Sequence, residues 1–464
     1  MRPAVKRIAS MTCVAALLFS LAACSSTSAA SSGSTEGAGT STQGEGASPE
    51  GQPPEKPGGQ GGFGGSGTVT QGTSANTINA DSSVYTETYE SDGDDENALR
   101  VDGAEVTLDD ITVKKSGGNS SNTEDGDFYG QNAALLATNG ATVSIRNARI
   151  LSSAQNGNGV FSYGEGTTVN ISDSVITTTA DNSGGLQTTG GGTTNASDLT
   201  IETSGNSSAA IRSDRGGGTV NADGGSYTSN GLNSPAVYST ADITVKNAAL
   251  TANNSEALVI EGQNSITLEN CTVSGSMSEN GTSADENTHN IMIYQSMSGD
   301  AEVGTSNFSM IGGSLTGKNG DLFYITNTHS TITLSSVTLN NEDNSANLMT
   351  IAGNSASHGW GTAGKNGAQV ELTADNQTLT GAITVDSIST LDLTLQNGSD
   401  FTGTLNIVDN AEGGTAVENN AVVTIGAGCT WTLTGDCTLT SLTNNGTINF
   451  NGHTITLADG TVLK

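Results

Sequence analysis

The sequence predicts an all-β protein folded as a right-handed parallel β-helix, with about ten coils of three short strands and a β-rich C-terminal end or cap. A small or polar residue followed by an aliphatic one recurs every 21 to 33 residues. Each such pair is followed by two apolar residues in strict alternation and then by a single apolar anchor. Asn, Asp or Gly returns at one fixed place in each unit, which indicates a turn.

The recurring pairs predict the first strand of each coil and its inward residue. They are Ala134-Leu135, Gly159-Val160, Gly185-Leu186, Ala210-Ile211, Ala236-Val237, Ala257-Leu258, Asn290-Ile291, Asp321-Leu322 and Asn347-Leu348. Alternation, as at Val143 and Ile145, indicates strands rather than helices. Strands of successive coils then pair in parallel and stack their aliphatic residues. Because parallel crossovers are overwhelmingly right-handed, the solenoid should be right-handed.

The turn column accounts for several acidic residues. Its members are Asn147, Asp173, Asp198, Gly224, Asn247, Asn270 and Gly312. These residue types tolerate a left-handed backbone, so we expect Asp173 and Asp198 to have a structural role and not a catalytic one.

The N-terminal 24 residues resemble a lipoprotein signal. Three basic residues precede an apolar run that is too short to span a bilayer, and the run ends in Leu21-Ala22-Ala23-Cys24. This ending resembles the lipobox of bacterial lipoproteins. The resemblance implies lipidation at Cys24 and an extracytoplasmic, membrane-anchored protein exposed at the cell surface. The alternative is a plain secretory signal that contains a cysteine.

The remaining chain divides by composition. Residues 25–80 are rich in Ser and Gly and predict a disordered tether, because they cannot bury enough apolar surface to fold. Residues 81–381 carry the regular repeat of the parallel β-helix. Residues 382–464 keep the alternation at shorter spacings, so they predict either a tapering end of the β-helix or a β cap.

The formal net charge is −32, which argues against nucleic acid as a partner because phosphate binding needs a positive field. Cys271 occupies an apolar position of the repeat and is expected in the core. Cys429 and Cys437 could form a disulfide outside the cytoplasm, although their order alone does not prove it. The four histidines show no ligand spacing, so no transition-metal site is expected.

The stretch AAIRSDRGGG, residues 209–218, suggests a contact site. Arg212 follows inward Ile211 and should point outward, with Asp214 at the next outward position beside Tyr163. The predicted outward row reads Leu136, Phe161, Gln187, Arg212, Tyr238, Val259, Met292, Phe323 and Met349.

Two interpretations of this row remain open. Inserted segments 114–132, 275–289 and 353–367 could pack over it, because exposed apolar rows are usually covered or bound. Alternatively, it forms a groove for a polymeric ligand. Phe161 and Tyr238 would then stack on sugar faces beside Tyr163, and Arg212 and Asp214 would hydrogen-bond hydroxyls or carboxylates.

Two acidic runs could bind Ca²⁺ as a possible cofactor, since hard cations prefer oxygen ligands near a glycine. One contains Asp92, Asp94 and Asp95, and the other contains Glu124, Asp125 and Asp127. Neither matches the full EF-hand pattern, and solvated loop acids are the alternative. A further hypothesis is that the threonine column at 142, 168, 193 and 219 matches ice, but the column breaks at Asp242 and threonine is common in exposed strands.

The repeat resembles the right-handed β-helix class that includes pectate-lyase-like enzymes and lipid-anchored, adhesin-like surface proteins of bacteria. The resemblance implies a non-enzymatic protein that binds an extracellular glycan or cell-surface component, and contacts the membrane through the anchor at Cys24. The alternative is a Ca²⁺-assisted polysaccharide lyase, in which Arg212 would act as a base. The usual local motifs of those enzymes are missing, and no cluster of acids lines one face of the predicted strands.

Overall fold

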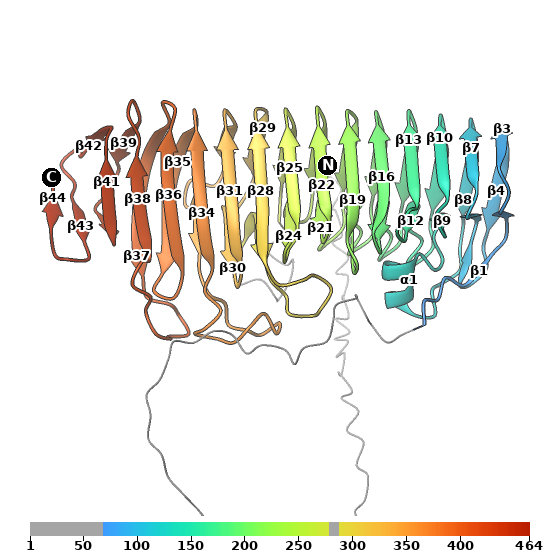
Figure 1. Cartoon of the computed structure of the whole chain (residues 1–464), viewed down its shortest axis with the longest axis horizontal. Coiled ribbons are helices and arrows are strands. Elements are labelled where there is room, and N and C mark those ends of the chain that lie inside the picture. The colour runs from blue at the N-terminus through green and yellow to red at the C-terminus, as the bar shows by residue number, and fades with distance from the viewer. Residues whose placement is uncertain (1–67, 278–286) are drawn as a thin grey trace, which may run out of the picture. The chain divides into compact units, whose positions relative to one another are not determined.

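The protein is a right-handed parallel β-helix, as the repeat predicted (Figure 1). The computed structural model describes residues 68–277 and 287–464. The predicted signal, Cys24 and most of the predicted tether lie outside these residues. Three long, all-parallel sheets of 15, 14 and 10 strands form the walls of the β-helix, and we call them sheets 1, 2 and 3 in the order in which a coil visits them.

Sheet 1 opens each coil. Its strands are β2 (Thr77–Ile78), β6 (Leu99–Asp102), β9 (Leu135–Thr138), β12 (Val160–Tyr163), β15 (Leu186–Thr189), β18 (Ile211–Arg212), β21 (Val237–Ser239), β24 (Leu258–Glu261), β27 (His289–Tyr294), β30 (Asp321–Thr326), β33 (Met349–Ile351), β35 (Thr378–Asp386), β37 (Asp400–Val408), β39 (Thr430–Leu433) and β42 (Thr447–Asn449).

Sheet 2 follows. Its strands are β3 (Ser82–Tyr85), β7 (Glu105–Asp109), β10 (Thr142–Arg146), β13 (Thr168–Ser172), β16 (Gly192–Ser197), β19 (Gly218–Asp223), β22 (Asp242–Lys246), β25 (Ser265–Glu269), β28 (Thr305–Ile311), β31 (His329–Ser335), β34 (Gln369–Asp375), β36 (Thr390–Gln396), β38 (Ala421–Ile425) and β41 (Ser441–Asn444).

Sheet 3 closes each three-stranded coil. Its strands are β4 (Thr88–Ser91), β8 (Thr112–Lys115), β11 (Arg149–Ser152), β14 (Val175–Thr178), β17 (Thr200–Thr203), β20 (Ser226–Ser229), β23 (Ala249–Ala252), β26 (Thr272–Gly275), β29 (Ser314–Gly317) and β32 (Thr338–Asn341). With ten strands in this sheet, the described chain has ten three-stranded coils, in agreement with the predicted number.

The two ends of the β-helix differ from its middle. At the N-terminal end, β1 (Thr73–Ser74) pairs with β5 (Glu96–Asn97), and β2 pairs with β6, so strands occur within the stretch predicted as tether. After β32 the coils have two strands only. Residues 382–464 continue sheets 1 and 2, and they end in a small separate sheet of β40 (Cys437–Leu439), β43 (Ile455–Leu457) and β44 (Val462–Leu463).

The inward residues stack in columns, as the alternation predicted. Leu135 pairs with Val160, which pairs with Leu186, and all three are essentially inaccessible. The core formed by these columns continues from Ala98 to Ile455. Each coil therefore buries its apolar side against its neighbours, and the stack is the stable unit.

One register differs from the prediction. The repeat placed Leu322 opposite Ile291, but the structure pairs Ile291 with Phe323 and Phe323 with Met349. Phe323 and Met349 therefore belong to the main core and not to the outward row. Tyr324 and Thr350 take their places in that row.

The corner between sheets 2 and 3 is the most regular part of the coil. Two residues separate the strands at every such corner of the three-stranded coils. The first of the two has a positive φ throughout, including Asp173 at 47°, Asp198 at 51° and Gly224 at 73°. The structural role predicted for the turn column is confirmed. The second residue often points into the core, as Leu199 and Cys271 do.

The described cysteines, Cys271, Cys429 and Cys437, are all buried and free, so the possible disulfide between the last two does not form. Cys271 is a core residue, as its position in the repeat predicted. Among the described residues, no helical segment has the length and hydropathy of a membrane span.

Candidate functional site

The N-terminal part of the outer face of sheet 1 is covered by α1 (Thr123–Tyr129). The side chain of Asn122 caps the helix by accepting a hydrogen bond from the Glu124 amide at 3.0 Å, and Gly130 ends it with a left-handed backbone at φ 80°. The helix belongs to the inserted segment between β8 and β9. Beneath this segment lies an apolar cluster of Ala133, Leu136 and Phe161, all fully buried, with half-buried Tyr163 at its edge.

Hydrogen bonds from sheet 1 attach α1. Thr189 donates to the Phe128 carbonyl at 2.6 Å, and Gln187 Nε2 donates to the Asp127 carbonyl at 2.9 Å. The Arg215 guanidinium lies 4.1 Å from the centre of the Phe128 ring and also pairs with Asp300 at 2.7 Å. The helix is therefore held to the sheet by polar as well as apolar contacts.

The C-terminal part of the same face is covered by the segment between β33 and β34. Trp360 packs against Tyr294, with ring centroids 4.7 Å apart, over a cluster that includes Met292 and Tyr324. The predicted row is therefore mostly buried and not exposed, and Phe161 in particular cannot stack on a sugar in this arrangement. Of the two interpretations left open, packing of inserted segments over the row is the one observed for segments 114–132 and 353–367, while most of segment 275–289 lies outside the described residues.

Arg212 lies between these two covers in a nearly buried ionic cluster. Its Nε donates to Asp214 Oδ2 at 2.8 Å, and its Nη2 lies 3.1 Å from Asp127 Oδ2 on α1. Only 12% of the Arg212 side chain and 10% of the Asp214 side chain are exposed. Because desolvated charges must be compensated, each member of this cluster depends on the others.

The cluster changes the acidity of its members. Burial raises the pKa of Asp214 to about 7, although the Arg212 guanidinium opposes this effect. Burial also raises the pKa of Asp127 against the same opposing charge. Burial alone would lower the pKa of Arg212, but the carboxylates of Asp127 and Asp214 hold it above its ordinary value. Arg212 is thus kept protonated, which is unfavourable for a catalytic base.

Tyr238 and Glu261 continue the polar cluster along the sheet. Tyr238 Oη donates to Glu261 Oε2 at 2.5 Å, and Tyr294 Oη donates to the same oxygen at 3.2 Å. Ser296 donates to the other carboxylate oxygen. Beside half-buried Tyr238 the surface has a cleft of about 210 Å³ whose lining includes Arg212, Asp214 and Tyr238. Three of the five predicted ligand-binding residues therefore lie together at one cleft, while Phe161 and Tyr163 lie in the cluster under α1.

The acidic run proposed for calcium is occupied by protein contacts. Asp94 accepts a hydrogen bond from the Asn119 amide at 2.8 Å, and Asp95 accepts one from the Ser121 amide at 2.6 Å. Buried Lys115 donates to the Gly93 carbonyl, and its ammonium lies near Asp92, Asp94 and Asp95. Burial lowers the pKa of Lys115, and these carboxylates oppose that effect.

The second acidic run belongs to α1 and not to a calcium loop. Across residues 68–277 and 287–464 there is no group of three or more His, Cys, Asp or Glu side chains that could hold a metal ion. The structure gives no support to a calcium site at Asp92, Asp94 and Asp95.

The outer face of sheet 2 was not singled out by the sequence analysis, apart from one threonine column. Its central row consists entirely of Ser, Thr and Asn, one from each strand of the sheet. The members, which we call the polar row, are Ser83, Thr107, Ser144, Asn170, Asn195, Asn221, Thr244, Thr267, Ser309, Thr333, Thr373, Thr394, Thr424 and Thr443. All are exposed or half-buried.

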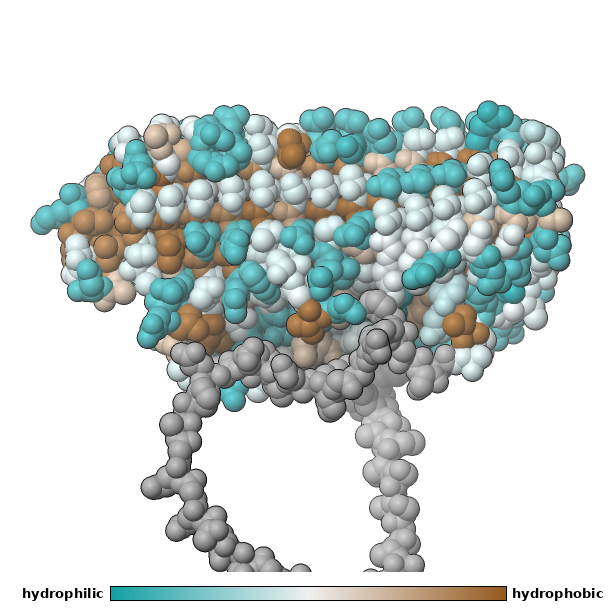
Figure 2. Space-filling view, viewed as in Figure 1, coloured by the Kyte–Doolittle hydropathy of each residue, from teal (hydrophilic) through white to brown (hydrophobic). Residues whose placement is uncertain are grey.

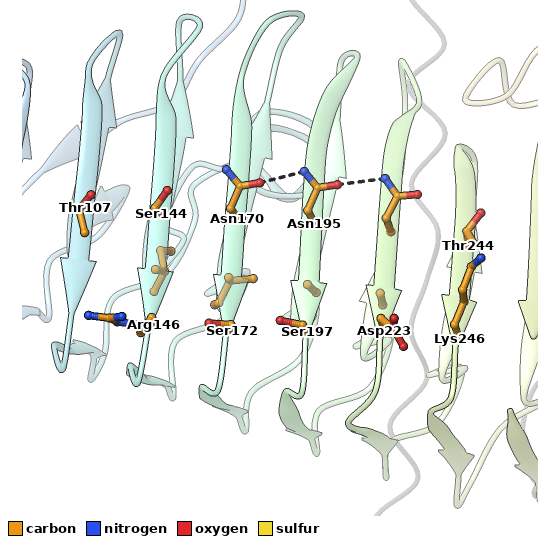
Figure 3. A pocket seen from close by; sticks show the side chains of 15 residues that line it. Thr107, Ser144, Arg146, Asn170, Ser172, Asn195, Ser197, Asp223, Thr244 and Lys246 are labelled. Carbon is orange, nitrogen blue, oxygen red and sulfur yellow. Dashed lines mark hydrogen bonds between the residues drawn. The ribbon is translucent and has the colours of Figure 1, made fainter. Parts of the chain in front are cut away.

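Figure 2 shows this face with near-white and teal side chains in long rows that run across the strands. In its N-terminal half the surface is hollowed into a shallow groove of about 710 Å³. Within the groove, Asn221 donates to Asn195 at 3.0 Å and Asn195 donates to Asn170 at 2.9 Å, which forms an amide ladder (Figure 3). The ladder fixes the orientation of these amides along the groove.

Charged residues line one side of the groove, where both cations are paired and Asp223 accepts a hydrogen bond from Asn247 at 2.7 Å. Arg146 pairs with Asp109 at 2.6 Å, and Lys246 pairs with Glu269 at 3.0 Å (Figure 3 labels Arg146 and Lys246). The threonines at 142, 168, 193 and 219 form the flanking row on the other side, in the register that the sequence predicted. The face is thus mainly polar, apart from exposed Ile311 on β28, and its central row carries no charge.

The sequence does contain a signal for the polar row: the residue between the two alternating apolar positions of each unit is Ser, Thr or Asn. Thr107, Ser144 and Asn170 each occupy this position. The signal is weak by itself because the whole chain is rich in small polar residues. Compared with known proteins, the chain matches no family model, and no curated protein is similar to it in sequence.

Proposed function

We propose that the protein is a non-enzymatic, lipid-anchored surface protein that binds an extended neutral glycan along sheet 2. The observation that carries the proposal is the polar row, which is unbroken over the 14 strands of the sheet. The proposal assigns the binding face to sheet 2, because the aromatic row of sheet 1 is covered.

The chemistry of the polar row suits a hydroxyl-rich polymer. Ser, Thr and Asn side chains each donate and accept hydrogen bonds, as sugar hydroxyls do. Neighbouring strands lie about 4.8 Å apart, so the row presents such groups at regular steps over roughly 60 Å. A long, regularly repeating ligand can use many of these positions at once, and its weak contacts then add up.

Charge selects among such polymers. The net charge of −32 repels polyanions, and the only cations lining the groove, Arg146 and Lys246, are paired with carboxylates. A neutral glycan avoids this repulsion. Attachment through Cys24 would keep the binding face outside the cytoplasm, and the Ser/Gly-rich segment after Cys24 would hold it away from the membrane.

The lyase alternative has less support. Arg212 would have to lose a proton to act as a base, but two carboxylates stabilise its charged form. Incubation of the full chain with polygalacturonate and Ca²⁺ should therefore release no unsaturated, ultraviolet-absorbing ends. Their appearance, and their loss in Arg212→Lys, would favour the lyase and overturn the proposal.

The decisive experiment compares two triple substitutions in the full chain. Asn170→Ala, Asn195→Ala and Asn221→Ala together remove the amide ladder, and should weaken binding of neutral oligosaccharides at least tenfold in isothermal titration calorimetry. The matched control is Thr177→Ala, Thr228→Ala and Thr251→Ala on the outer face of sheet 3, at the same half-buried level. Equal binding by both variants, or equal loss in both, would contradict a site on sheet 2.

A further inference from the structure

The cleft on sheet 1 lies in the window between the two covers. Toward the N-terminus the face is closed by α1, and toward the C-terminus it is closed by Trp360 and its neighbours. The cleft has a volume of about 210 Å³, roughly that of seven liquid waters, and its lining includes Ser207, Asn233 and Tyr238. This volume is large enough for one small molecule but too small for several sugar units of a polysaccharide chain.

The charges around the cleft do not balance. Two carboxylates, those of Asp127 and Asp214, pair with one guanidinium, that of Arg212, and the Glu261 carboxylate lies next to them on the Tyr238 hydroxyl. Arg212 contacts both oxygens of Asp127 but only Oδ2 of Asp214. Glu261 is held by the neutral hydroxyls of two tyrosines and a serine. With the Asp127 and Asp214 carboxylates both ionised, the cluster carries surplus negative charge.

One acceptor of this cluster is left without a partner. Asp214 Oδ2 accepts from Arg212 at 2.8 Å and from Gln187 at 2.6 Å. No described residue donates a hydrogen bond to its Oδ1, and this oxygen is not among the fully buried atoms that lack a partner, so it is open to the cleft that Asp214 lines. A carboxylate oxygen that opens onto a cleft can accept a hydrogen bond from a ligand or from water.

We propose that this cleft binds a primary ammonium group carried by a molecule no larger than a monosaccharide. The ammonium would donate to Asp214 Oδ1, and the half-buried ring of Tyr238 would pack against the carbon next to it. This site is separate from the polar row on sheet 2 and does not depend on the glycan proposal.

The composition of the cleft selects this ligand over two others. An anion would meet surplus negative charge, and the donors of Arg212 are already directed to carboxylates and to the Ser207 carbonyl. A metal ion needs several oxygen ligands around one point, and the described residues hold no such group. An ammonium needs one carboxylate, further acceptors and an aromatic wall, all of which are present.

Ammonium binding should depend on pH in a defined direction. Burial raises the pKa of Asp214 to about 7, and only the ionised carboxylate attracts the ammonium. The charged or titratable groups that face Asp214 are Arg212 on β18, Asp127 on α1, Tyr238 on β21 and Asp300 in the segment after β27. Apparent affinity should rise about tenfold between about pH 6 and about pH 8, as the ionised fraction rises. Binding near neutral pH should release a proton.

The test uses the full chain and three probes in isothermal titration calorimetry: methylammonium, glucosamine and glucose. We expect methylammonium and glucosamine to bind, glucose not to bind, and Asp214→Asn to weaken the two amines at least tenfold. The control is Asp242→Asn at the exposed start of β22, outside the groove on sheet 2, which should leave amine binding unchanged. Equal amine binding by Asp214→Asn and by the unsubstituted protein would overturn the proposal.

A second measurement keeps the proposal testable if Asp214→Asn does not fold. The affinity of the unsubstituted protein for methylammonium is then measured across the same pH range. Affinity that stays constant or falls overturns the site. The triple asparagine substitution on sheet 2 should leave amine binding intact, so failure of the glycan proposal and failure of this one give different results.

Discussion

Sheets 1 and 2 are built by the same repeat, yet the outer face of sheet 1 is mostly covered while that of sheet 2 is accessible. The outward row of sheet 1 carries aromatic, aliphatic and charged residues, and two inserted segments bury most of it. The outward row of sheet 2 carries only small polar residues, and every member remains accessible. The comparison teaches that large outward side chains in a β-helix need not mark a binding face, because insertions at the corners can fold over them.

The substitution Arg212→Ala is expected to have the largest effect on stability and so tests this contrast most strongly. The substitution leaves Asp127 and Asp214 desolvated without a counterion, and should lower the free energy of unfolding by about 3–5 kcal/mol. Chemical denaturation measures the loss, and limited proteolysis near residues 116–132 should show that α1 is released. The control is Arg146→Ala on sheet 2, whose side chain is 61% exposed. A similar melting temperature for both variants would remove the distinction between the two faces.

A second test removes the other cover. Trp360→Ala deletes the half-buried ring that packs on Tyr294, and should cost about 2 kcal/mol, less than the loss of a fully buried aromatic. The same denaturation experiment measures the change, and binding of a hydrophobic dye should increase as Tyr294 and Met292 become accessible. A stable variant that binds no dye would mean that this segment does not cover the row.

The third test uses pH. The folded-state pKa of Asp214 is about 7, above the unfolded value near 4, so the folded state holds the proton more tightly between these values. Stability should therefore fall as the pH rises from about 4 to about 7. Asp214→Asn should flatten the thermal-denaturation profile across that range. An unchanged profile would mean that Asp214 is not buried in its ionic cluster.

The smallest effect on stability is expected on sheet 2. Asn195→Ala removes two hydrogen bonds at the surface and should change the free energy of unfolding by about 1 kcal/mol or less. Its effect on glycan binding should be larger than its effect on stability. A loss of stability as large as that of Arg212→Ala would show that the polar row is structural and not a binding face.

The fold could be predicted because the repeat consists of residue types whose position in a coil is restricted by burial or by backbone conformation. Aliphatic residues that alternate with polar ones must face the core, and Asn, Asp or Gly at the corner accepts a positive φ. The alternation fails to set the register where consecutive residues are all apolar. In β30, Leu322, Phe323 and Tyr324 are all buried, so the pattern could not tell which of them faces the main core.

The candidate site was only partly predictable. The outward direction of Arg212 and its neighbourhood with Tyr238 follow from strand geometry, and the structure agrees. Its partner Asp127 lies 85 residues earlier on an inserted helix, and no local pattern connects the two. The sequence alone did not reveal the polar row, because small polar residues are the commonest kind in this chain. Only the strand register shows that its members form a continuous line.

The constant corner between sheets 2 and 3 has a consequence for how such a protein can change. All ten corners of the three-stranded coils keep two residues, the first with a positive φ, so an insertion there would interrupt this regular stack of corners. The long inserted segments lie at the other corners: α1 between sheets 3 and 1, and the segment with Trp360 between sheets 1 and 2. Foreign sequences should be tolerated between sheets 3 and 1, and the protein could serve as a scaffold on which new loops are grafted while the face of sheet 2 stays in register.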